Sequence, residues 1–134
     1  RDHALERAYT ARAKHGPVID ADAILRIMDD REVVRYPVAV RFDASGIRKG
    51  EFAHAEPLGD HPSAGFCLFV HPQLEHRRDL LPLALAYHIA PINYGDIVET
   101  EDCEAFGAAL LGLGVEVYYQ QLCDLADSLG PAQP

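Results

Sequence analysis

The chain has 134 residues, of which 49% are hydrophobic and 25% charged, the composition of one ordinary globular domain. Because no run of 18 apolar residues occurs, no transmembrane helix is expected. All 12 lysines and arginines precede position 79, and the second part of the chain carries the whole formal net charge of −9. An acidic surface repels phosphate groups, so we expect binding to neither nucleic acid nor membrane.

Two helices are predicted at the start of the chain. Residues 2–14 contain few β-branched side chains, and Gly16-Pro17 follows them, which predicts a helix that ends before this pair. Asp20 is a favourable N-cap for a second helix over residues 21–29. Ile24, Ile27 and Met28 would form the apolar face of that helix.

The middle of the chain predicts three strands. Apolar residues occupy every even position from Val34 to Ala44, the pattern of a half-buried strand, and Pro37 favours an edge position. Turn residues then lead to a second strand over residues 51–58, and residues 66–70 are apolar on both faces, as in a central strand. Short connections predict an antiparallel meander.

Three helices are predicted after the strands. Asp79 would cap a buried helix over residues 80–89, which Pro91 and a turn at residues 93–95 would end. Thr100 would cap the next helix, and the last helix covers residues 115–129. The sequence therefore predicts a single α+β domain with two N-terminal helices, a three-stranded antiparallel sheet and three C-terminal helices packed on one sheet face.

Histidines and acidic residues concentrate between positions 54 and 88, which contain five of the seven histidines. Imidazole and carboxylate groups bind transition metals and transfer protons near neutral pH. His54 and Glu56 share one face of the second strand, roughly 7 Å apart along it. They could converge on one ion, or they could form the solvated face of an edge strand.

Two other positions decide whether this segment forms one site. His71 ends the third strand, and a helical turn over residues 72–77 would bring Glu75 and His76 close to it, although Pro72 breaks the spacing of zinc-protease motifs. His88 lies in an apolar helix, where it could be a neutral, hydrogen-bonded core residue or a ligand. The residues can meet only if this helix packs on the sheet face that carries His54.

The metal hypothesis predicts zinc or another divalent transition metal bound by residues on the strands and the following helix. The predicted ligands are His54, Glu56, His71 and His88, with His61, Glu75 and His76 as alternates. A separate hypothesis concerns the loop at residues 93–96. Its Tyr94 and Asp96 could bind a ligand, although turn formation explains the same residue types.

The three cysteines are widely spaced and form no CxxC pair, so we predict reduced core residues. Residues 1–15 are polar and show no signal peptide, and we expect a cytoplasmic protein. The sequence contains no phosphate-binding loop and no nucleophile elbow. It favours a non-catalytic module that needs no cofactor and binds a small ligand or a partner.

A homodimer through the C-terminal helices is a further expectation, because Tyr118 and Tyr119 lie beside the apolar stripe of the last helix. The alternative function is that of a metal-binding protein or metal-dependent hydrolase that uses the His and Glu residues between positions 54 and 88. Whether the protein is an enzyme is left open by the sequence.

Overall fold

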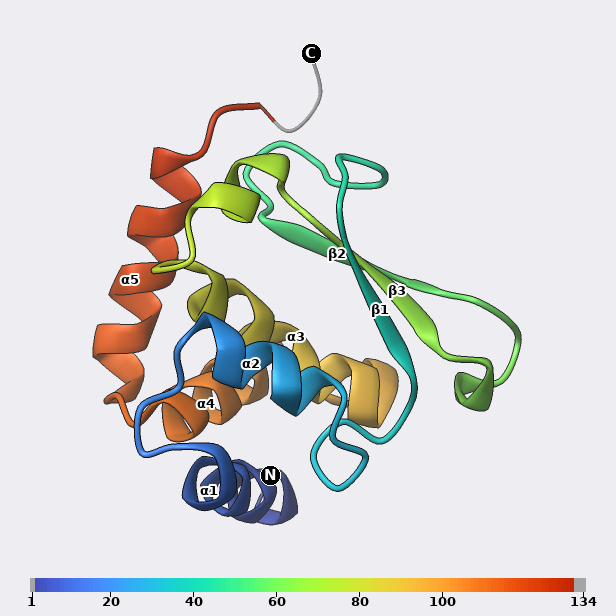
Figure 1. Ribbon diagram of the computed structural model, residues 1–134, viewed down its shortest axis with the longest axis vertical. Coiled ribbons are helices and arrows are strands. Elements are labelled where there is room, and N and C mark those ends of the chain that lie inside the picture. Colours follow the sequence, from blue (N-terminus) through green and yellow to red (C-terminus); the bar gives the residue numbers. More distant parts are fainter. Residues whose placement is uncertain (1, 132–134) are drawn as a thin grey trace.

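The computed structural model describes residues 2–131 and shows a small sheet beside a layer of helices (Figure 1). Two helices precede the sheet and three follow it, so the predicted α+β class and helix order are confirmed. The main elements, in chain order, are α1 (Asp2–His15), α2 (Ala21–Met28), β1 (Val38–Phe42), β2 (Ala53–Pro57), β3 (Phe66–Val70), α3 (Leu81–Tyr94), α4 (Thr100–Leu111) and α5 (Val115–Ser128). Short 3-10 helices occur at Pro62–Ala64 (η1), Pro72–His76 (η2) and Gly95–Ile97 (η3).

The sheet has the strand order β1-β3-β2, so β3 is central, as its apolar sequence predicts. β2 is antiparallel to β3, but β1 is parallel to β3, and the predicted all-antiparallel meander is therefore wrong for this pair. The segment 43–52 between β1 and β2 is too long for a tight hairpin. It carries the chain past the central position, which β3 then fills.

Side chains alternate across the sheet, and the helices cover one face of it. In β1 the even positions Val38, Val40 and Phe42 are half-buried whereas Ala39 and Arg41 are exposed, as the period of two predicts. In β2 the core face carries Ala53 and Ala55. Small side chains at these positions let the helical layer approach the backbone.

α3 is the central helix of the domain, in contact with α2, α4, α5 and β2. Its sequence is apolar on nearly all sides, and it is buried as predicted. The predicted start at residue 80 is right within one residue, but the predicted cap and the predicted C-terminal end are wrong. Asp79 does not cap the helix but pairs with Arg77 at 3.1 Å, and the helix continues through Pro91 to Tyr94.

Asn93 explains why α3 extends past Pro91. Its side chain is buried, accepts a hydrogen bond from the Arg35 N–H at 2.8 Å and donates one to the Val33 carbonyl at 2.7 Å. These bonds hold the segment that leads into β1 against the last turn of α3. Tertiary bonding therefore outweighs the local preference of Asn for a turn.

The other predicted caps are right for α2 and wrong for α4. The Asp20 carboxylate accepts a hydrogen bond from the Ala23 N–H at 2.9 Å, which confirms the N-cap of α2. α4 begins at Thr100, but its N-cap is Glu99, whose N–H donates to the Asp102 carboxylate at 2.9 Å. The acidic residues expected in this first turn thus also complete the cap.

α5 lies along the outside of the helical layer (Figure 1) and is fixed by Tyr118. The Tyr118 ring is fully buried, and its hydroxyl donates a hydrogen bond to the Leu83 carbonyl on α3 at 2.8 Å. Gly107 on α4 makes room for this ring, because a Cβ atom there would lie 2.4 Å from it. Tyr118 is therefore a core residue and unavailable to the predicted dimer interface.

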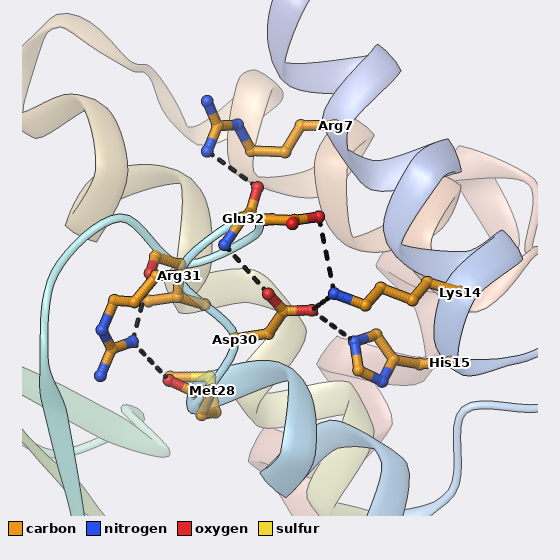
Figure 2. A network of polar contacts seen from close by, with 8 residues as sticks. Arg7, Lys14, His15, Met28, Asp30, Arg31 and Glu32 are labelled. Atoms are coloured by element: carbon orange, nitrogen blue, oxygen red, sulfur yellow. Dashed lines mark hydrogen bonds and ion pairs between the residues drawn. The ribbon is translucent and has the colours of Figure 1, made fainter.

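A polar network joins α1 to the turn after α2 (Figure 2). The Asp30 carboxylate lies 2.8 Å from both Lys14 Nζ and His15 Nε2 and accepts a hydrogen bond from the Glu32 N–H at 3.0 Å. Burial acts to raise the pKa of Asp30, but the bonds from Lys14 and His15 outweigh it and lower the pKa from 3.8 to about 2. The network is a structural connection in which the carboxylate is fully partnered.

Helix length and composition also bear on membrane insertion. Within residues 2–131, none of the helices combines the length and the apolar character needed to cross a lipid bilayer.

Candidate functional site

The first two predicted metal ligands, His54 and Glu56, do meet. His54 Nε2 lies 2.8 Å from Glu56 Oε2 on the face of β2 opposite Ala53 and Ala55. Ala53 and Ala55 pack in the hydrophobic core, whereas His54 is partly exposed. His54 lies near enough to His88 for its charge to lower the pKa of that imidazole, but within residues 2–131 no hydrogen bond joins the two rings.

His71 is held in another part of the fold. It is buried, its Nδ1 accepts a hydrogen bond from the Gln73 N–H at 3.2 Å, and its Nε2 donates to the Gly130 carbonyl at 2.7 Å. Gln73 in turn accepts a bond from the Gly130 N–H at 2.8 Å. Both ring nitrogens of His71 are thus used to join η2 to the segment after α5, which leaves no lone pair for a metal.

The alternate ligands do not complete a metal site. His61 Nδ1 accepts a hydrogen bond from the Ser63 N–H at 3.1 Å, and Glu75 and His76 are exposed on η2, whose helical turn was predicted. In the described part of the chain, residues 2–131, no group of three or more His, Cys, Asp or Glu side chains could hold a metal ion. His54 pairs with Glu56, but His71 is bonded to Gly130, and the four predicted ligands do not form one group.

The predicted ligand residues Tyr94 and Asp96 are also separate. Tyr94 lines a small cavity of about 130 Å³ near Ile97 and Val98, and its hydroxyl lies 3.2 Å from His3 Nδ1. Asp96 is exposed on η3 and lies outside the lining of this cavity. The two side chains do not face one common space.

His88 has a different environment from every other histidine described above. Its ring packs edge-on against Phe52 and Tyr87, with centroid separations of 5.6 and 5.4 Å. Burial, with a smaller contribution from the charge of His54, lowers the pKa of His88 from 6.5 to about 4. The imidazole is therefore neutral at neutral pH, and it makes no hydrogen bond to any residue between 2 and 131.

This unpartnered imidazole lines a cavity of about 280 Å³ between the start of β2 and helices α3, α4 and α5. Most of the surrounding side chains are aromatic or aliphatic. The lining consists of Gly50, Glu51, Phe52, Ala53, Tyr87, His88, Glu104, Tyr119, Leu122, Cys123 and Ala126. Apolar walls with a few directed polar groups are typical of small-molecule sites, whose volumes begin near about 300 Å³.

The charged residues of the lining are both carboxylates, Glu51 and Glu104. Glu51 is exposed and accepts a hydrogen bond from the Arg48 N–H at 2.8 Å. Glu104 is half-buried, and no ion pair or hydrogen bond joins its side chain to the rest of residues 2–131. Burial first, and the neighbouring Cys103 and Glu104, raise the pKa of the Tyr87 hydroxyl, so this group stays neutral.

The cysteines differ in access to this cavity. Cys67 and Cys103 are buried, and burial raises the pKa of the Cys103 thiol to about 11. Cys123 is only partly buried and lines the cavity, next to Tyr119. The prediction of three core cysteines is thus confirmed for two of them, and Cys123 is the thiol with access to the cavity.

Sequence reasoning identified His88 but missed Glu104, Tyr119 and Cys123. A signal for two of them was present. Tyr119, Leu122, Cys123 and Ala126 follow the spacing i, i+3, i+4, i+7 and form a second apolar stripe on α5, beside the stripe that enters the core. The sequence contains no comparable signal for Glu104, because it lies in an acidic first turn that helix capping explains.

Comparisons with known proteins add no assignment: no family model, curated protein or solved structure matches this chain.

Proposed function

We propose that the chain is a non-catalytic module that binds a small, largely apolar molecule in the cavity beside His88. The observation that carries this proposal is the neutral imidazole that lines the cavity without a hydrogen-bond partner among residues 2–131. His88 is half-buried, and its ring nitrogens stay accessible, so a ligand can bond one of them in place of water. The apolar body of such a ligand would contact Phe52 and Tyr87.

The lining favours binding over catalysis. Cys123 is the strongest nucleophile among the lining residues, and its contact is the hydroxyl of Tyr119 instead of a basic group. Nucleophilic catalysis by a thiol needs a base or a positive charge that stabilises the thiolate. Glu51 and Glu104 have the opposite effect on a developing negative charge.

Cys123 provides a direct test of cavity occupancy. The rate at which it reacts with a disulfide reagent should fall, in a saturable manner, when one of three probes with a phenyl ring (benzyl alcohol, benzylammonium or benzoate) enters the cavity. In Ala126→Phe the new ring fills the cavity, and the probes should no longer change the rate. Ala39→Phe is the matched control, because Ala39 is exposed on β1 and lies outside the lining. If none of the three probes slows the reaction in the wild type, the proposed function is wrong.

The homodimer expected from the sequence can use only part of the predicted surface. Tyr118 is buried, but Val115, Val117 and Tyr119 are about half exposed on α5. Light scattering after size exclusion tests this expectation, because Val117→Asp should shift a dimer to monomer. A wild-type monomer at high concentration would contradict it. The cytoplasmic location expected from the sequence remains a prediction.

A further inference from the structure

We propose that the ligand of this cavity is a small organic cation, in which an ammonium or amidinium group is attached to an apolar body. This inference rests on the proposed function and specifies the chemical class of its ligand. The structure assigns the positive group to Glu104 and the apolar body to the aromatic side chains beside it.

The charge of the lining favours a cation. Glu51 and Glu104 are carboxylates, and among residues 2–131 neither Lys nor Arg lines the cavity. Arg48 and Lys49 face a neighbouring, wider cleft that also contains His54 and Asp127. A carboxylate in a half-buried position is more strongly desolvated than one on the surface, and a bound cation would offset that loss of hydration.

The aromatic walls of the cavity also favour a cation. Phe52 and Tyr87 meet edge to face with ring centroids 5.8 Å apart, and Tyr119 lies on the opposite element, α5. The face of an aromatic ring attracts a cation, and this attraction is larger in a site sheltered from water. Aromatic rings and a carboxylate together recognise an organic ammonium ion, whereas an anion would be repelled by both.

His88 is in a protonation state that is compatible with a cationic ligand. A protonated imidazole would introduce a positive charge into the lining and oppose a cationic ligand. Burial lowers the pKa of His88 to about 4, so the ring is neutral near pH 7. It can then accept one of the ligand's N–H groups, a bond that no residue between 2 and 131 makes with it.

The experiment compares the same three probes, which share a phenyl ring and differ in charge. Binding is measured from the rate of Cys123 labelling and, independently, from amide chemical shifts of Gly50 and Phe52. Benzylammonium should bind at least about fivefold more tightly than benzyl alcohol, as expected for one partly shielded charge pair. Benzoate should bind more weakly than both.

Matched variants assign the charge preference to one residue. Glu104→Gln should bring benzylammonium and benzyl alcohol to within about twofold of each other. Glu116→Gln, at an exposed position on α5 outside the cavity, should keep the wild-type preference. The charge preference itself is measured on the wild-type protein, so it can be tested even where a variant does not fold.

The outcomes separate this inference from the proposed function. Binding of benzyl alcohol with equal or higher affinity than benzylammonium, or preferential binding of benzoate, would overturn the organic cation and leave the binding cavity in place. A charge preference that Glu104→Gln does not reduce would overturn the role of Glu104. Absence of saturable binding by all three probes would overturn both proposals.

Discussion

Two regions of this protein differ in whether their polar side chains are bonded by other residues. The side chains of Asp30 and Asn93 are bonded to other segments of the chain, and these bonds hold α1, α2 and β1 in place. Around the cavity, His88 and Glu104 have no hydrogen-bond or ion-pair partner among residues 2–131. The bonds of the first region stabilise the fold, whereas the polar groups of the second are the ones that the proposed ligand would bond.

The largest expected effect concerns the partnered region. Asn93→Leu keeps the branching and the number of heavy atoms of the side chain but leaves the Arg35 N–H and the Val33 carbonyl without their partners, which should lower the free energy of unfolding by about 3 kcal/mol. Urea unfolding measures this change. Gln121→Leu, another replacement of an amide by leucine, is the control on α5 and should change stability by no more than about 0.5 kcal/mol. Equal effects at the two positions would contradict the assigned role of Asn93.

The second prediction concerns His88 and pH. The unfolded chain binds a proton at His88 near pH 6.5, whereas the folded protein does so only near pH 4. The His88 contribution to stability is therefore complete above pH 6.5 and is lost as the pH falls toward 4, by at most about 3 kcal/mol.

Urea unfolding at neutral pH and at two pH values within this window measures the effect. His88→Leu should remove this part of the pH dependence, whereas His61→Leu, at an exposed histidine, should retain it. Parallel stability profiles for the wild type and His88→Leu would show that His88 does not titrate differently in the two states.

Asp30→Asn should have a smaller effect than Asn93→Leu. The change removes the charge that Lys14 and His15 share, and we expect a loss of about 2 kcal/mol at neutral pH. Because the folded pKa of Asp30 is lowered from 3.8 to about 2, the wild-type advantage exists above pH 3.8 and disappears as the pH falls toward 2. Asp29→Asn, at an exposed neighbour, is the matched control for both measurements.

The smallest stability effect is expected at Glu104. Since its carboxylate has no partner among residues 2–131, Glu104→Gln should change the free energy of unfolding by less than about 0.5 kcal/mol. Thermal unfolding measures this difference. A large destabilisation would mean that Glu104 belongs to the partnered region and would weaken the contrast between the two regions.

Local patterns in the sequence predict most of the secondary structure. Asp20 is the N-cap of α2 because its carboxylate bonds a backbone N–H three residues away, which needs no distant partner. The alternation at Val38, Val40 and Phe42 predicts the half-buried strand β1 for a similar reason, since the period of two is a property of the strand itself. Helix order and the α+β class follow from such local signals.

The errors arise where distant segments compete with local preferences. Pro91 and Asn93 read locally as a helix end, but the bonds from Asn93 to Val33 and Arg35 extend α3 past them. The parallel pairing of β1 with β3 depends on the path of residues 43–52, which the strand patterns do not encode. His71 read as a potential ligand, but Gly130 occupies its Nε2 from the far end of the chain.

The candidate cavity shows the same division. Local sequence is enough to show that the segment up to His88 is rich in imidazole and carboxylate groups, and that α5 carries apolar stripes. The cavity that His88 shares with Glu104 and Tyr119 depends on the tertiary structure. Residue type fixes what a side chain can bond, whereas the packing of α3, α4 and α5 fixes which side chains line a common cavity.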